Sequence, residues 1–355
     1  MSSTPLLEVR NLRTQLTTDK GPVFPCDDVS LIVNAGEAVG LVGESGSGKS
    51  MTALSIMGLV PNPPGKVVSG EVLLNGRNIV GLSNKEMSRV RGRDVAMVFQ
   101  DPSTYLDPVM TVGGQIAEAV RRHQPETDVR RKVDEALDLV GLPVGAKFAR
   151  RYPHELSGGM RQRILIAIAL SCRPAMLIAD EPTTALDVTI QAQILELLSS
   201  IQRELGMGLL FISHDIGVIG NLCNRLYVMY AGQVVEEART SSFLEMPAHP
   251  YGKGLLRSVL SVDEGADRYY AIGGGVPNLA HLPSGCRFHP RCEYRRDTRC
   301  ADAVPQPTSS TSGGSAACHW VEEIRAQEPR TELGSPDRPM TASGEKNGYQ
   351  QEGLS

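Results

Sequence analysis

Residues 43–50 form the stretch that most constrains how this chain folds. The run GESGSGKS, from Gly43 to Ser50, fits the pattern G-x-x-x-x-G-K-[ST]. An apolar run at 38–42 predicts a buried strand before it, and residues 51–57 predict the start of a helix after it. The pattern is informative only between a strand and a helix, and this sequence supplies both.

A loop of this composition is suited to holding phosphate groups. Glycines let the backbone turn tightly and bring amide N–H groups against phosphate oxygens, and the following helix N-terminus adds free donors and partial positive charge. Lys49 is placed to reach the β- and γ-phosphates, and the Ser50 hydroxyl to bind Mg²⁺. The alternative is a glycine-rich turn with a chance lysine, which the flanking strand and helix disfavour. The expected nucleotide contacts here are Gly43, Ser45, Gly46, Ser47, Gly48, Lys49, Ser50 and Met51.

Composition describes an ordinary globular chain with no strong charge field. Of 355 residues, 41% are hydrophobic and 21% charged, and the net charge is -4, so no basic field indicates a nucleic-acid partner. The longest apolar runs, such as 164–170, fall short of a bilayer span, and the first residues lack the pattern of a signal peptide. We therefore expect a cytoplasmic location.

Apolar runs and helical patterns alternate along the chain, which predicts an α/β fold with a largely parallel sheet. An insertion of helical character is expected at about 108–172, inside a domain spanning 1–245. A smaller extension follows at 246–323, and residues 324–355 are poor in large apolar side chains, which predicts a disordered tail. Strands are predicted at 7–12, 29–33, 70–76 (ending in an Asn-Gly turn), 95–100, 175–180 and 208–213, followed by a hairpin of 225–230 with 232–236. Helices are predicted at 112–120, 129–140, 164–170, 188–205 and 253–259.

Five elements occur in one order along the chain. After the phosphate loop come Gln100 at the end of a strand, the run LSGG at 156–159, the acidic pair Asp180 and Glu181 after an apolar strand, and His214 after another strand. Taken singly, an acidic pair can cap a helix, a histidine can be structural and LSGG can be a turn. Their occurrence in this order together with the phosphate loop indicates a functional site and not five unrelated structural features.

This constellation resembles the ATP-binding subunit of an ABC transporter over residues 6–240. The resemblance implies a P-loop NTPase fold. Its parts are a RecA-like core, an inserted helical subdomain and an antiparallel β N-terminal part, followed here by the small cysteine-containing C-terminal extension.

The same resemblance implies roles for the motif residues. Glu181 is expected to act as general base toward water, with His214 and Gln100 beside it, and Ser50, Gln100 and Asp180 are expected to hold Mg²⁺. Ser157, Gly158 and Gly159 are expected to contact the ATP bound to an opposite subunit, with Asp187 at the subunit boundary. Relatives often stack an aromatic residue on adenine, but the corresponding position here is Leu16. We therefore expect only modest selectivity for ATP over GTP.

Within that family the chain resembles the oligopeptide, dipeptide and nickel importer ATPases. Three segments carry this resemblance: FQDPSTYLDP at 99–108, YPHELSGGMRQR at 152–163 and HPY at 249–251. It implies two transmembrane permease partners, a second and non-identical ATPase subunit, and an extracytoplasmic peptide-binding protein. The implied location is peripheral, on the cytoplasmic face of the cell membrane. Import of nickel or another solute, a drug exporter, and a soluble ATPase acting on nucleic acid or ribosomes are the alternatives.

Seven cysteines fall into two groups. Three are scattered and are expected in the core, whereas four cluster near the C-terminus with spacings that match neither a close-paired zinc site nor a ferredoxin run. The resemblance implies a [4Fe–4S] cluster, and five nearby arginines are expected to offset its charge; a zinc ion or no metal are the alternatives. The proposed ligands are Cys286, Cys292, Cys300 and Cys318.

Overall fold

The protein is described by a computed structural model that places residues 4–184, 186–263, 270–309 and 314–325. Its N-terminal part is an antiparallel sheet in the order β2-β1-β4-β5, as predicted. A two-residue turn at Asn75 and Gly76, both with positive φ, joins the last two of these strands, as the Asn-Gly dipeptide indicated. The strands are β1 (Leu7–Thr18), β2 (Gly21–Val33), β4 (Gly65–Leu74) and β5 (Arg77–Asn78).

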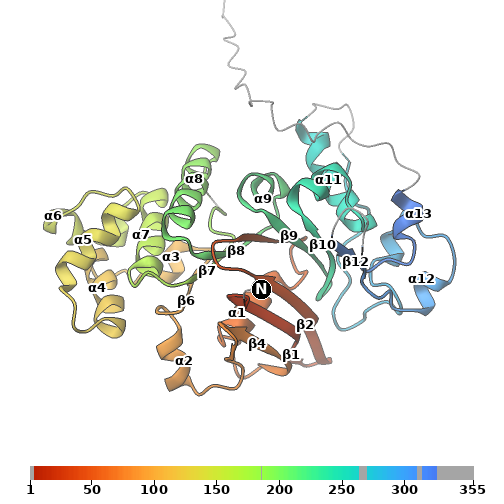
Figure 1. The fold of residues 1–355 in the computed structure, drawn as a ribbon, viewed down its shortest axis with the longest axis horizontal. Coiled ribbons are helices and arrows are strands. Elements are labelled where there is room, and N and C mark those ends of the chain that lie inside the picture. Colours follow the sequence, from red (N-terminus) through yellow and green to blue (C-terminus); the bar gives the residue numbers. More distant parts are fainter. Residues whose placement is uncertain (1–3, 185, 264–269, 310–313, 326–355) are drawn as a thin grey trace, which may run out of the picture.

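The second sheet runs through the centre of the molecule in the order β11-β12-β10-β9-β3-β8-β7-β6 (Figure 1). Strands β9, β3, β8, β7 and β6 are parallel neighbours, which confirms the α/β prediction, and β9 and β10 form the predicted hairpin. Its strands are β3 (Ala38–Val42), β6 (Val95–Val98), β7 (Met176–Asp180), β8 (Gly208–Ser213), β9 (Arg225–Tyr230), β10 (Gln233–Arg239), β11 (Thr308–Ser309) and β12 (Gly314–Ala316).

Successive side chains of the central strands point to opposite faces of the sheet, so the hydrophobic core is divided into two layers. In β3, Val39 and Leu41 face the layer shared with the N-terminal sheet and α1 (Lys49–Ile56), whereas Ala38 and Val42 face the opposite layer. Both faces of the sheet are thus covered, which explains why these strands read as continuous apolar runs. The carboxyl ends of β3, β6, β7 and β8 consequently meet along one edge.

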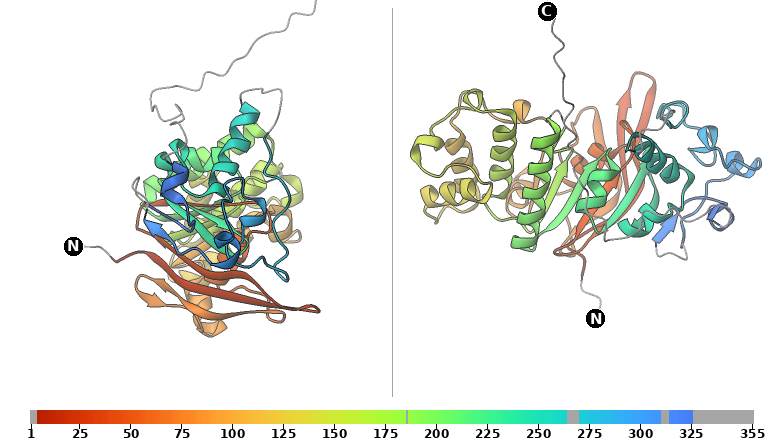
Figure 2. Two further views of the ribbon diagram at one scale, coloured as in Figure 1. Left: turned by 90° about the vertical axis from the view of Figure 1, so that its right-hand side faces the viewer. Right: turned by 90° about the horizontal axis from the view of Figure 1, so that it is seen from above.

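The helical insertion and the C-terminal extension lie at opposite ends of the central sheet (Figures 1 and 2). The insertion contains α4 to α7, where the sequence predicted helices. The helices of the whole ATPase part that follow α1 are α2 (Asn84–Val90), α3 (Pro102–Tyr105), α4 (Val112–His123), α5 (Val129–Leu139), α6 (Ala146–Ala149), α7 (Gly158–Leu170), α8 (Val188–Leu205), α9 (Ile216–Leu222) and α10 (Thr240–Glu245). Within the described ranges, no helix is both long and apolar enough to cross a bilayer.

The C-terminal extension packs on the core through an aromatic cluster and a strand pairing. The ring of Phe288 lies 5.2 Å from that of Tyr230 in β9 and 5.3 Å from that of Tyr251. Strand β12 pairs antiparallel with β10, which covers that strand's edge. The helices of the extension are α11 (Pro250–Asp263), which starts three residues earlier than predicted, α12 (Arg299–Asp302) and α13 (Val321–Arg325).

Helix α13 carries the ordered structure two residues past the predicted start of the tail. Ile324, which the composition had placed in that tail, is 1% exposed because it packs in the extension. The rest of the predicted tail, 326–355, lies outside the described residues.

Candidate active site

The phosphate loop is built as its glycines require. Gly48 has a φ of 110°, and a Cβ there would collide with the Pro25 carbonyl and the Met229 side chain. Gly46 has a φ of 80°, and a Cβ there would meet no other atom within 4 Å, so its face is open toward the pocket. Helix α1 begins at Lys49, directly after the loop, so its free N–H groups point into the same space.

Lys49 is held under the loop by the loop's own backbone. Its Nζ donates to the carbonyl oxygens of Gly43 (2.7 Å) and Glu44 (3.0 Å) and lies 3.8 Å from Oε1 of Glu181. Burial lowers the pKa of this ammonium group, and the surrounding carboxylates oppose that effect. The side chain is 4% exposed, so its charge acts where water screens it little.

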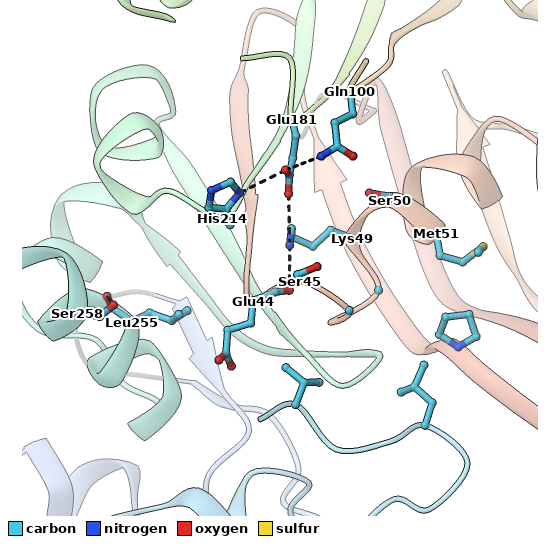
Figure 3. A pocket seen from close by; sticks show the side chains of 15 residues that line it. Glu44, Ser45, Lys49, Ser50, Met51, Gln100, Glu181, His214, Leu255 and Ser258 are labelled. Carbon is cyan, nitrogen blue, oxygen red and sulfur yellow. Dashed lines mark hydrogen bonds and ion pairs between the residues drawn. The ribbon is translucent and has the colours of Figure 1, made fainter. Parts of the chain in front are cut away.

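Glu181 is the point on which the polar side chains of the pocket converge (Figure 3). Its Oε2 lies 3.3 Å from Nδ1 of His214 and accepts hydrogen bonds from Nε2 of Gln100 (3.2 Å) and Oγ1 of Thr184 (3.0 Å). Its backbone has a φ of 44°, a conformation that is strained for a residue with a side chain. The strained backbone and three neighbours fix this carboxylate at the end of β7.

Asp180 and Ser50 supply oxygen ligands beside that carboxylate. Ser50 Oγ donates to Oδ1 of Asp180 at 3.0 Å, and Asp180 is 6% exposed. Burial raises the pKa of Asp180 to about 6, with a smaller contribution from the charge of Glu181. A buried carboxylate next to a hydroxyl is the kind of oxygen donor set that Mg²⁺ prefers, and a divalent cation would favour the ionised form.

These residues surround one large cavity, of about 1040 Å³, at the carboxyl edge of the central sheet. The predicted site residues that line it are Ser45, Gly46, Gly48, Lys49, Ser50, Met51, Gln100, Glu181 and His214. Of the remaining loop residues, Gly43 contributes its carbonyl to Lys49, and Ser47 is fully buried beneath the loop.

Of the other residues predicted for the nucleotide site, Asp180 lies behind Ser50, its hydrogen-bond partner, and four more are not brought to this cavity. Ser157 caps α7, where its hydroxyl accepts from the Met160 amide (3.4 Å), and Gly158 and Gly159 form the first turn of that helix. Ser157 and Gly158 are exposed. Asp187 caps α8 through its bond from the Ile190 amide (2.9 Å) and is also exposed. One subunit therefore leaves this motif facing solvent.

The cavity also has lining residues that the sequence did not point to. Leu255 and Ser258 come from α11, Val276 and Leu279 come from the loop that follows it, and Pro25 comes from β2. Leu255 follows the HPY run that marks the extension, but no local pattern marked it or the other four as part of the nucleotide site. Leu16, the position considered for adenine, does not line the cavity; its side chain lies against Gly65 instead.

The four clustered cysteines meet at a second, small cavity of about 20 Å³. Burial raises the pKa of the Cys292 thiol to about 12 and that of Cys318 to about 11. Among the described residues, no group of three or more His, Cys, Asp or Glu side chains is arranged to hold a metal ion, so the predicted cluster finds no support there. The scattered cysteines, Cys26, Cys172 and Cys223, are buried as predicted.

The arginines of the cysteine segment do not all serve the thiols, as the sequence had suggested. Arg287 bonds to Asp27 in β2 and to the Ala231 carbonyl, and Arg291 pairs with Glu44 of the phosphate loop. Their partners belong to the ATPase core because the segment packs against it. Arg296 and Arg299 lie over the ring of Trp320, at 5.6 and 5.8 Å from its centroid.

Comparison with known proteins agrees with this geometry. Residues 26–184 match the family model for ABC transporters, and residues 235–300 match the model for the oligopeptide/dipeptide transporter C-terminal region. The chain is 45% identical to a putative peptide import ATP-binding protein of Brucella ovis, over 92% of this chain and 100% of that protein.

Two further comparisons extend this likeness. The oligopeptide transport ATP-binding protein AppD of Bacillus subtilis is also 45% identical, over 91% of this chain and 99% of that protein. A dimeric ATP-binding cassette in a post-hydrolysis state with ADP and phosphate superimposes with a TM-score of 0.59 at 28% identity, covering 66% of this chain and 98% of that chain.

Proposed function

The chain belongs to the ABC transporter family of ATP-binding proteins, in the group with the oligopeptide/dipeptide transporter C-terminal region, and we propose on this premise that it is the ATP-hydrolysing subunit of a peptide importer. The observation that carries the proposal is the placement of Glu181. Its carboxylate lies between Gln100, His214 and Lys49 in the cavity that the phosphate loop borders.

In this proposal Glu181 orients the attacking water and takes its proton as the water's oxygen bonds to the γ-phosphorus of ATP. ADP leaves with the electrons of the broken P–O bond. His214 (3.3 Å) and Gln100 (3.2 Å) both hold Oε2 of the carboxylate, whereas Oε1 faces Lys49, which offsets charge on the phosphates.

Mg²⁺ fits the oxygen donors at the end of β7. Ser50, Asp180 and Gln100 are the residues proposed to hold it, and the buried Asp180 carboxylate with Ser50 at 3.0 Å is the observation that supports this. When bound, the ion would neutralise charge on the β- and γ-phosphate oxygens.

A second ATPase subunit completes the site in this proposal. The exposed N-terminus of α7, with Ser157, Gly158 and Gly159, offers free N–H groups to an anion and lies outside the cavity that its own subunit's phosphate loop borders. In a head-to-tail dimer it would meet the ATP held by the partner's loop, with Asp187 near the boundary. Because the described residues carry one nucleotide domain, this site needs a second ATPase chain, and we propose a non-identical one, as the resemblance to the peptide importer ATPases implies.

A groove next to the helical insertion is the proposed contact with the permeases. It has a volume of about 550 Å³, and its lining includes Phe99, Tyr105 and Met110. The rings of Phe99 and Tyr105 stack at 4.0 Å, yet Tyr105 remains 50% exposed and Val109 next to it 83% exposed. An apolar helix end from the cytoplasmic side of a permease is the proposed occupant, since α3 follows Gln100 directly and links the groove to the catalytic site.

The other proposed components of the transporter and its cellular location are those implied by the resemblance to peptide importers. An extracytoplasmic binding protein would deliver peptide to two permeases, and this subunit would sit peripherally on the cytoplasmic face of the membrane. Nickel or another solute is the alternative cargo, because substrate contacts belong to the other subunits. The C-terminal region and the relatives' names favour an importer over an exporter or a soluble ATPase acting on ribosomes.

We further propose that the four cysteines hold a [4Fe–4S] cluster. All four line the same small cavity, whose lining also includes Trp320, and the buried Nε1 donor of that indole has no hydrogen-bond partner among the described residues. A sulfur-rich group offers acceptors to such donors and four-thiolate ligation suits iron–sulfur clusters.

Two measurements test these proposals. Purified protein captured with its membrane partners should hydrolyse ATP and co-purify with permeases; recovery of ribosomes without any permease would overturn the importer proposal. Anaerobically purified protein should be coloured and contain iron. Colourless, iron-free protein, or protein with zinc in a 1:1 ratio, would overturn the cluster proposal.

A further inference from the structure

The C-terminal extension supplies three of the five apolar side chains that line the nucleotide cavity. Its polar part consists of the phosphate loop and the residues around Glu181, and its apolar lining comes from Pro25, Met51, Leu255, Val276 and Leu279. No Phe, Tyr or Trp occurs among the described residues that line it. A base bound here has aliphatic side chains to pack against, and two of the five come from the loop after α11.

Residues 272–279 of that loop pack against the rest of the protein at more than one point. Upstream, Ile272 packs against α11 at Gly254, where even a Cβ would come within 2.9 Å of Ile272 Cγ1. Val276 and Leu279 are half-buried, pack against the main core and line the cavity. Figure 3 shows the segment along the lower edge of the cavity, across from Glu181 and Gln100.

Arg291 joins this segment to the phosphate loop. Its Nε donates to the Gly273 carbonyl (2.8 Å), and its Nη2 donates to the carbonyls of Ile272 (3.3 Å) and Gly274 (3.2 Å). The same guanidinium holds the Glu44 carboxylate at 2.8 and 3.0 Å. One side chain, 7% exposed, thereby sets the position of the segment relative to the loop.

We propose that residues 272–279 of the C-terminal extension form the base-binding wall of the nucleotide site, with Val276 and Leu279 in contact with the purine and Arg291 as a positioning residue. The inference deepens the proposed ATPase function and rests on it. The phosphate loop fixes the triphosphate, so the base extends toward the apolar part of the cavity. The wall takes over the contact that Leu16, which lies elsewhere, does not make.

The physical consequence is affinity for a purine with little discrimination between purines. Removal of apolar surface from water does not depend on the exocyclic groups that distinguish adenine from guanine. Strong discrimination requires buried polar groups that pair with those exocyclic groups, and the aliphatic wall supplies none. The wall therefore strengthens binding of ATP relative to inorganic tripolyphosphate, which has no base.

The test compares dissociation constants of ATP and inorganic tripolyphosphate, both with Mg²⁺, by calorimetry on the full chain. Leu279→Ala and Val276→Ala should each weaken ATP binding about four- to fifteenfold, the effect of losing contact with one or two methylene groups, and leave tripolyphosphate binding unchanged. Val304→Ala is the matched control, since Val304 lies in the same extension but is 55% exposed outside the cavity. Unchanged ATP binding, or equal losses for both ligands, would overturn the proposal.

A second measurement uses the unaltered protein and so does not depend on how the variants fold. A photoreactive 8-azido-ATP places its reactive group on the base, and labelled peptides are identified by mass spectrometry. The label should appear in the peptide that contains Val276 and Leu279, and excess ATP should suppress it. Labelling confined to β1 and β2 would overturn the wall while leaving the ATPase function intact, whereas failure of the wild-type chain to bind ATP would overturn that function itself.

Discussion

The guanidinium of Arg291 and the carboxylate of Glu44 form a two-pronged ion pair, with Nη1–Oε2 at 2.8 Å and Nη2–Oε1 at 3.0 Å. Glu44 is the second residue of the phosphate loop, whereas Arg291 stands directly before a clustered cysteine. The Glu44 amide also donates to the Tyr251 hydroxyl at 2.8 Å. The extension thus contacts the phosphate loop through both Arg291 and Tyr251. Changes in the cysteine segment should therefore alter nucleotide binding.

Arg291→Lys should lower the free energy of unfolding by about 1–3 kcal/mol and raise the KM for ATP, because an ammonium group cannot keep both prongs and the bonds to 272–274 at once. Thermal unfolding and steady-state ATP hydrolysis measure the two effects. Arg10→Lys is the control: Arg10 pairs with Glu8 in the same two-pronged way at 2.7 and 2.9 Å but is 51% exposed. Equal effects of the two changes would show that the buried pair has no special role.

Glu181→Gln should retain ATP binding and lose hydrolysis by at least about a hundredfold, since an amide cannot accept the water's proton. The amide can still bond to Gln100 and Thr184, so the fold should be kept. ATP-bound subunits should then accumulate as dimers, which size-exclusion chromatography with ATP detects.

Glu196→Gln, on the exposed face of α8, is the matched control and should hydrolyse ATP at the wild-type rate. Hydrolysis by Glu181→Gln at the wild-type rate would remove this carboxylate from its role. Loss of ATP binding together with hydrolysis would mean that the glutamate shapes the site and does not act on water.

Asp180→Asn should weaken the dependence of ATP affinity on Mg²⁺. The amide preserves the size of the side chain and an acceptor for Ser50, but it removes the negative charge that attracts the cation. We expect wild-type affinity for ATP to fall sharply on addition of EDTA and the variant's affinity to change little. A variant as responsive to Mg²⁺ as the wild type would place the cation elsewhere.

The sequence predicted the residues that belong to a local pattern, such as a motif or the end of an apolar strand. The phosphate loop, Asp180, Glu181 and His214 end strands of a parallel sheet, so their meeting at one edge follows from topology. Helix α8 was predicted with its observed bounds because its amphipathic pattern is local, whereas the role of Asp187 as its N-cap was not predicted.

The contacts of the extension escaped prediction because they join residues far apart in sequence. Nothing local shows that Arg291 reaches back 247 positions to Glu44, or that Val276 and Leu279 line the nucleotide cavity. A cluster of arginines beside cysteines suggested a single electrostatic purpose. Packing against β2 and the phosphate loop gave Arg287 and Arg291 carboxylate partners in the core instead.

Leu16→Tyr should neither tighten ATP binding nor alter the ratio of ATP to GTP affinity. The Leu16 side chain lies against Gly65, outside the cavity, so an aromatic ring there meets packed backbone and not the base. We expect a loss of stability from overpacking of about 1–3 kcal/mol. Wild-type protein itself should bind ATP and GTP with similar affinity; strict ATP specificity, or a gain of ATP affinity in the variant, would contradict this account.

For the proposed iron–sulfur cluster, Trp320→Phe should change the redox potential while the iron is retained. The indole Nε1 is buried with no partner among the described residues, in the lining of the cavity of the four cysteines, and phenylalanine keeps a six-membered aromatic ring while deleting that donor. Hydrogen bonds to cluster sulfur favour the reduced, more negative state. Loss of one bond worth about 0.5–1.5 kcal/mol should lower a one-electron potential by about 20–60 mV. A redox titration followed by electron paramagnetic resonance measures the shift, with iron content as the check on cluster retention and Tyr105→Phe, far from the cysteines, as the control. An unchanged potential at full iron content would mean that the Trp320 donor does not face the cluster.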